Sequence, residues 1–140
     1  MADSLPPAII VHSLDHALAA AVAATAVNSP LVLRSAPGAG GSVGVGWFAA
    51  LAEALAERHP ALPMTLILDC ADEAGTVLGA FRRGLKRVRF TGPPAVAAKL
   101  AAIAALQGAA LDEDARPALD LLGHADPEAV CREWLAGHQR

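Results

Sequence analysis

Residues 30–69, PLVLRSAPGAGGSVGVGWFAALAEALAERHPALPMTLILD, contain the pattern that decides the fold. The apolar run PLVLRS (30–35) is followed by a glycine-rich segment, by the helical pattern WFAALAEALAERH (47–59), and by a second apolar run, MTLILD (64–69). Short runs of consecutive apolar residues are typical of strands that are covered on both faces. Strands joined through a helix pair in parallel. The stretch therefore predicts a strand–helix–strand unit of a parallel sheet.

The same alternation extends over the rest of the chain. Apolar runs recur at 8–13, 86–92 and 117–123, with helical patterns between them. Ser13 is expected to cap the first helix, and Asp126-Pro127-Glu128 the last. We therefore predict one α/β domain over residues 1–140, with a five-stranded parallel sheet and a flavodoxin-like three-layer sandwich of strand order 2-1-3-4-5. The alternative is a partial (β/α) barrel that a second subunit completes.

Composition narrows the class of protein. The chain is 54% hydrophobic and 18% charged, which favours a self-associating protein. A net charge of −3 argues against nucleic acid as a partner. No apolar run is long enough for a membrane helix, and the N-terminus MADSLPP lacks the pattern of a signal peptide. Cys70 and Cys131 are expected to be free thiols, so we predict a cytoplasmic protein.

Candidate site residues lie where the predicted strands end, because ligands of α/β folds bind beyond the carboxyl ends of the strands. His12, Asp69 and His124 are the candidate acids and bases. The candidate ligand-binding residues are Ser13, Ser35, Gly38, Gly40, Gly41, Ser42, Gly44, Gly46, Asp72, Thr91 and Gly92.

The glycine-rich segment shares part of its pattern with known nucleotide-binding loops. The spacing Gly40-x-x-x-Gly44-x-Gly46 resembles the loops of short-chain dehydrogenases, with Asp69 in the place of the ribose-binding acid. However, the chain has no tyrosine, so the catalytic Tyr-x-x-x-Lys pair of that family is absent, and no lysine follows the glycines as in a P-loop. We predict no cofactor, and a mobile connection able to bind an anion.

The residue types at the strand ends bear on phosphoryl transfer, metal binding and thiol chemistry. Asp69 and Thr91 resemble the phospho-acceptor and switch threonine of response-regulator receivers, but the acidic pair and the lysine of that family are missing, so only the topology transfers. His12, His16 and His124 have no spacing diagnostic of a metal site, and we predict none. Cys70 is expected to be a buried structural cysteine rather than a nucleophile.

Three segments also resemble a family of short bacterial α/β proteins that has no established activity. They read IIVHSLDHALAA (9–20), GWFAALAEA (46–54) and LILDCADEAGTVLGAFRRGLKRVRFTG (66–92). The resemblance implies the α/β fold, and it transfers no catalytic residue.

Two functions follow from these observations. The first is a self-associating protein that binds a small anionic ligand at the carboxyl ends of the strands. The second is an enzyme, a lyase or hydrolase of a phosphorylated or carboxylated metabolite. The second function requires His12, Asp69 and His124 to converge on one pocket.

Overall fold

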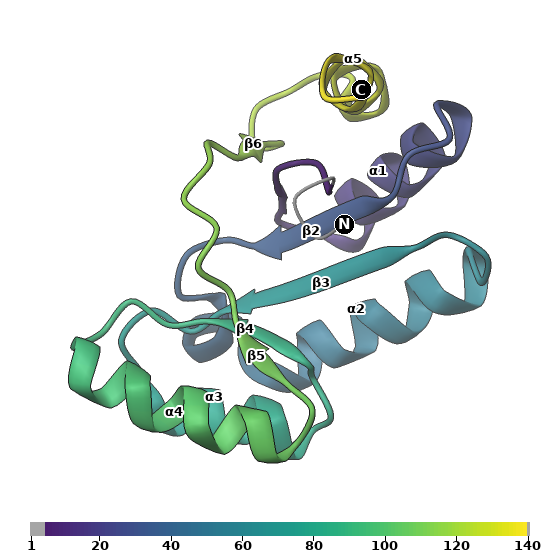
Figure 1. Cartoon of the computed structure of the whole chain (residues 1–140). Coiled ribbons are helices and arrows are strands. Elements are labelled where there is room, and N and C mark those ends of the chain that lie inside the picture. The colour runs from purple at the N-terminus through teal and green to yellow at the C-terminus, as the bar shows by residue number, and fades with distance from the viewer. Residues whose placement is uncertain (1–4, 140) are drawn as a thin grey trace. The chain divides into compact units, whose positions relative to one another are not determined.

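The computed structural model describes residues 5–139 of the chain, so the first four residues of the N-terminal MADSLPP segment lie outside the described residues. Contacts divide the chain into two compact units. Figure 1 labels the helices and strands of which they are built. The first unit comprises residues 1–34, 53–65 and 115–140, and the second comprises residues 35–52 and 66–114. Each unit is described by itself.

The first unit is built on strand β1 (Ile9–Val11). β1 lies between β2 (Leu31–Ser35) and β6 (Leu119–Asp120), and its pairing with β6 is parallel. Helix α1 (Leu14–Ala26) packs against α5 (Pro127–Gly137). The buried residues of α1 are all alanines. The short side chains on this face allow the α1 backbone to lie close to its neighbours.

Both helix starts predicted in this unit are confirmed. The hydroxyl of Ser13 accepts a hydrogen bond from the backbone N–H of His16 at 3.1 Å. The carboxylate of Asp126 accepts one from the N–H of Ala129, also at 3.1 Å, and Pro127 occupies the first helical position. These contacts satisfy amide groups that have no partner within the helix.

The second unit contains strands β3 (Met64–Asp69), β4 (Arg87–Arg89) and β5 (Ala110–Leu111), which are neighbours in this order. The pairings of β3 with β4 and of β4 with β5 are parallel. Helices α3 (Ala74–Arg82) and α4 (Pro94–Leu106) pack against each other. Strands β2 and β3 each begin in the first unit and end in the second.

The core of the second unit is centred on Phe48, which is fully buried. Phe48 belongs to helix α2 (Val45–Arg58) and is clustered with Leu68 of β3, Phe81 of α3 and Val88 of β4. Side chains from strands and from helices therefore enter one apolar cluster, which holds the layers of this unit together.

The glycine-rich segment is helical, and the prediction of a long mobile connection does not describe its form. Only Ala36–Ala39 separates β2 from the π-helical turn η2 (Gly40–Gly44), which continues directly into α2. Two glycines of the segment have a positive φ, 72° at Gly38 and 114° at Gly44. At these two positions the backbone conformation favours glycine over any other residue.

The predicted fold class is confirmed as an α/β fold with a parallel sheet flanked by helices, and two details differ. The described residues form six strands rather than five, because Ala110–Leu111 also form a strand, β5, which pairs in parallel with β4. The strand predicted at 117–123 is β6, and its neighbour is β1. The order 2-1-3-4-5 is therefore wrong. β1 has β2 and β6 as its neighbours, and β1 to β5 follow one another in chain order, as strands do in a segment of a (β/α) barrel.

Candidate functional site

Four residues of the first unit form a polar cluster at the carboxyl ends of β1 and β6. We call His12, Ser13, His16 and Asp120 the carboxyl-edge cluster. His12 follows β1 directly, and Asp120 is the last residue of β6. Because the two strands are parallel neighbours, their ends bring these side chains together. His16 joins them from the first turn of α1.

An ion-pair geometry links His12 and Asp120. Nε2 of His12 lies 2.7 Å from Oδ1 of Asp120, and the two side chains are 24% and 48% exposed, so solvent and small molecules reach them. The same carboxylate oxygen accepts the N–H of Leu122 at 2.9 Å. An ionised carboxylate only accepts hydrogen bonds, so His12 carries a proton on Nε2, and its Nδ1 has a free lone pair when the ring is neutral.

The second imidazole of the cluster, His16, has the same tautomer, but it is engaged through Nδ1 instead of Nε2. Nδ1 of His16 accepts the backbone N–H of His12 at 3.1 Å, which places the proton of a neutral His16 on Nε2. The two rings are perpendicular, with centroids 5.8 Å apart. The cluster therefore combines an imidazole lone pair on His12 with an imidazole N–H on His16.

Burial and electrostatics assign charges to two of these groups. Burial, together with the neighbouring His12, lowers the pKa of His16 below 6.5, against the smaller raising effects of Asp120 and Asp15. Burial raises the pKa of Asp120, but the N–H of Leu122 and the ring of His12 together lower it below 3.8. At neutral pH His16 is therefore neutral and Asp120 is ionised.

These directions predict how stability depends on pH. Between the ordinary pKa of histidine and the lower pKa of folded His16, the unfolded chain binds a proton that the folded chain does not, so stability falls as the pH is lowered through this window. Urea unfolding at pH 7.5 and at about pH 5 should show a smaller loss for His16→Gln than for the wild type. An equal loss in both proteins would contradict the prediction. Asp120 should add a further loss below its ordinary pKa, which Asp120→Asn removes.

In the second unit, Asp69 organises the start of the glycine-rich segment. The residue is only 6% exposed, and Oδ1 accepts the N–H groups of Gly38 at 3.0 Å and of Ala71 at 2.9 Å. Its own backbone N–H donates to the hydroxyl of Ser35 at 2.9 Å. These hydrogen bonds join the carboxyl ends of β2 and β3, and they give Asp69 and Ser35 a structural role.

The backbone amides expected to bind an anion are mostly engaged within the protein. The N–H of Gly38 donates to Asp69, and those of Gly41 and Ser42 donate to the carbonyl of Gly38 at 3.1 Å. A Cβ placed on Gly41 would lie 2.1 Å from Oε1 of Glu73, so that carboxylate already lies against this backbone. The geometry of the segment gives an anion little support here, because an acidic side chain lies where the anion is expected.

The glycines also have a packing role. A Cβ on Gly40 would lie 2.9 Å from Sγ of Cys70 and 3.0 Å from Cγ2 of Thr76. A Cβ on Gly46, inside α2, would lie 3.3 Å from Nη1 of Arg83. Close approach of Cys70 and Thr76 therefore accounts for glycine at position 40, whereas the group near Gly46 is the end of a flexible side chain.

The remaining predicted site residues lie apart from any shared constellation. Asp72 and Thr91 are exposed, and the N–H of Thr91 donates to the carbonyl of Ala71 at 2.8 Å. Gly92 lines a cavity of about 450 Å³ beside α4. His124 is exposed in the turn after β6, and within the described residues its ring makes no hydrogen bond.

Thiol and metal chemistry find no support among residues 5–139. Burial, then the charges of Asp69 and Glu73, raise the pKa of Cys70 to about 12, so the thiol stays protonated and is a poor nucleophile. In that part of the chain no group of three or more His, Cys, Asp or Glu residues is arranged to hold a metal ion. No helix there is long and apolar enough to cross a membrane.

Sequence reasoning missed Asp120 because the last strand was predicted to run to Gly123. β6 ends three residues earlier, since the Asp120 carboxylate takes the N–H of Leu122 and turns the chain. An aspartate that bonds the amide two residues ahead is typical of a turn. Asp120 inside PALDLLG (117–123) was the available signal for this strand end.

No protein-family model matches this sequence, and no curated protein does. Among solved structures, one from Coccidioides immitis, described as a "putative fructose-1,6-biphosphate aldolase", matches with a TM-score of 0.62 and 23% sequence identity. The match covers 79% of this chain and 41% of that chain, so this chain spans less than half the length of that structure. The chain shares its α/β fold with part of that aldolase-like structure.

Proposed function

We propose that this chain is a lyase that uses the carboxyl-edge cluster for acid–base chemistry on a small phosphorylated or carboxylated hydroxy-carbonyl metabolite. The observation that carries the proposal is the 2.7 Å contact between His12 and Asp120 at the carboxyl ends of two parallel strands. Asp120 holds the His12 ring and supports its positive charge when the ring takes up a proton. A carboxylate has this role beside the imidazole base of many enzymes.

Two groups of the cluster have separate tasks in this reaction. Nδ1 of His12 removes the proton from a substrate hydroxyl, and the neighbouring carbon–carbon bond breaks as that oxygen becomes a carbonyl. The electron pair of the broken bond passes into the carbonyl-bearing fragment, which leaves as an enolate. The N–H at Nε2 of His16 donates to the enolate oxygen, and His12 returns its proton to the enolate carbon. Base and donor in one site are the minimum that such proton transfer needs.

Two features support the substrate class. The structural neighbour is described as an aldolase of a sugar bisphosphate, and its fold is shared with this chain. Ligands of open and closed α/β sheets bind at the strand ends where the cluster lies. The expected convergence of His12, Asp69 and His124 is not found among residues 5–139, since Asp69 bonds Gly38 and Ala71 in the second unit and no contact joins His124 to His12. The proposed chemistry therefore uses Asp120 and His16 beside His12 in place of Asp69 and His124.

The test follows proton exchange directly. Wild-type protein is incubated in D₂O with a panel of phosphorylated and carboxylated hydroxy-carbonyl compounds and with the matching carbonyl fragments, and ¹H NMR follows cleavage and deuterium uptake. We expect His12→Gln to lower the rate by about 10²–10⁴-fold, which is the usual contribution of a general base. Asp120→Asn should lower the rate by less and shift its pH profile, since it removes only the orienting charge.

A matched control separates chemistry from folding. His138→Gln replaces an exposed histidine that bonds the carbonyl of Trp134 in α5, and it should leave the rate unchanged. Circular dichroism and thermal unfolding of each variant check that the fold is intact. No exchange by the wild type with any compound, or an unchanged rate in a folded His12→Gln protein, would contradict the lyase and leave ligand binding without catalysis.

Three further predictions belong to this proposal. Self-association is supported by exposed apolar side chains, of which Leu106 is 88% and Leu122 66% exposed. A reducing, cytoplasmic location is supported by two free, buried cysteines. Membership of the short bacterial α/β family is supported by the three quoted segments.

A further inference from the structure

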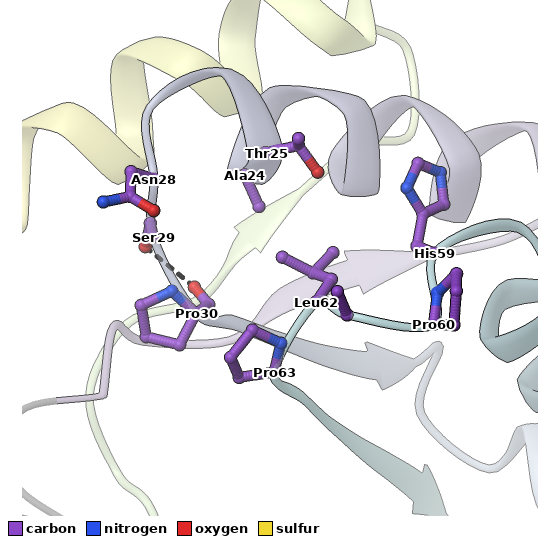
Figure 2. A pocket seen from close by; sticks show the side chains of 10 residues that line it. Ala24, Thr25, Asn28, Ser29, Pro30, His59, Pro60, Leu62 and Pro63 are labelled. Carbon is purple, nitrogen blue, oxygen red and sulfur yellow. Dashed lines mark hydrogen bonds between the residues drawn. The ribbon is translucent and has the colours of Figure 1, made fainter.

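A second cavity lies in the first unit, at the amino ends of β2 and β3 (Figure 2). It measures about 350 Å³ and is bounded by the end of α1, by the turn that follows it, and by the segment 59–63 before β3. The carboxyl-edge cluster lies instead where β1 and β6 end. The cavity therefore has no part in the proposed lyase chemistry.

The walls of this cavity are held by hydrogen bonds of the backbone. The N–H of Leu31 donates to the carbonyl of Pro63 at 3.0 Å and ties the two walls together. In one wall, the N–H of Ser29 donates to the carbonyl of Ala24 at 2.9 Å, and in the other the N–H of Leu62 donates to that of His59 at 3.2 Å. A ligand thus meets a preformed site, which is the usual condition of a small-molecule pocket.

Most of the lining is apolar. Three prolines contribute to it, Pro30, Pro60 and Pro63, and Figure 2 shows Leu62 between the end of α1 and the proline rings. No aspartate, glutamate, lysine or arginine is among the lining residues. An ion would lose its hydration without gaining a counter-charge, so this lining selects against charged ligands.

A few polar groups remain for a ligand. The hydroxyls of Thr25 and Ser29 donate to the carbonyls of Ala21 and Pro30, at 2.9 and 2.8 Å, and their protons are not available. The side-chain amide of Asn28 and the ring of His59 make no hydrogen bond within the described residues. The cavity therefore offers flat apolar surfaces with an imidazole and an amide.

We infer that this cavity binds a neutral, ring-sized, mostly apolar molecule that carries one hydroxyl or ring N–H, such as a phenol or an indole. Proline rings pack well against aromatic faces, as they do in proline-rich recognition. The imidazole of His59 or the amide of Asn28 meets the single polar group. The volume lies at the lower end of that of small-molecule pockets and fits one or two rings.

The test is an NMR titration of the full ¹⁵N-labelled chain with phenol and with indole, and with benzoate and benzylamine as charged analogues. We expect saturable shifts of amides in 24–30 and 59–62, and affinities for the charged analogues at least about tenfold weaker. Ala61→Phe, which fills the cavity from an exposed position, should weaken binding about tenfold, and His59→Ala should weaken it by less.

Ala56→Phe, at an exposed position of α2 outside the lining, is the matched control and should bind like the wild type. The ¹⁵N spectrum of each variant reports whether it is folded. Absence of saturable shifts up to the solubility of both neutral probes, equal affinity for benzoate, or unchanged binding by folded Ala61→Phe would overturn the inference.

Discussion

Replacing Phe48 by alanine is expected to lower the free energy of unfolding by about 4 kcal/mol, as for other fully buried aromatic residues. Phe48 is the largest of the fully buried side chains, and it joins α2 to residues from β3, α3 and β4. Its removal leaves a cavity that this tightly packed cluster cannot close by small movements. Urea unfolding of wild type and variant at neutral pH measures the difference.

Trp47 supplies the comparison for this experiment. It directly precedes Phe48 in the same helix, but it is only partly buried and packs against the cluster. Trp47→Ala should therefore cost clearly less than Phe48→Ala. If the two variants lost equal stability, Phe48 would not be the centre of the second unit.

Replacing Asp69 by alanine is the second large change, with an expected loss of about 3 kcal/mol. The substitution leaves the N–H groups of Gly38 and Ala71 without their acceptor, and an unsatisfied buried group costs about 1–3 kcal/mol. Ala71 also has a φ of 52°, in the left-handed region that costs energy for a residue with a side chain. Its hydrogen bond to Asp69 helps to hold that conformation.

Two further variants test whether the lost hydrogen bonds cause this loss of stability. Asp69→Asn keeps an oxygen acceptor, so its loss of stability should be less than half of that of Asp69→Ala. Asp72→Ala removes a nearby exposed carboxylate and should change the stability by less than about 0.5 kcal/mol. A loss in Asp69→Ala no larger than that of Asp72→Ala would show that the bonds to Gly38 and Ala71 contribute little.

Local chemistry explains which parts of the fold could be predicted. Ser13, Asp126 and Pro127 act within one turn of the chain, so the helix starts that they predict are confirmed. The helical form of Gly40–Gly44 was missed, because glycine has low helix propensity and the sequence does not reveal that Cys70 and Glu73, far along the chain, lie close to this backbone.

In the candidate site, too, the local feature was predicted and the contact between distant residues was not. His12 was found because it follows a strand. Its partner Asp120 is 108 residues away, and only the parallel pairing of β1 with β6 joins them. The sequence pattern did not predict that pairing, since the short strand β5 takes the place beside β4 that the last strand was expected to occupy. Strand order depends on contacts between distant residues, which periodicity does not report.

The all-alanine buried face of α1 limits how this chain can vary. Ala17, Ala20, Ala21, Ala23 and Ala24 are buried, and each fills its place with a single methyl group. A larger residue would push the helix outward, and such overpacking usually costs about 1–3 kcal/mol. In a deep mutational scan this face should accept little beyond glycine and serine. Part of the chain's high alanine content therefore reflects positions of α1 at which larger residues do not fit. We expect these positions to change slowly as the sequence evolves.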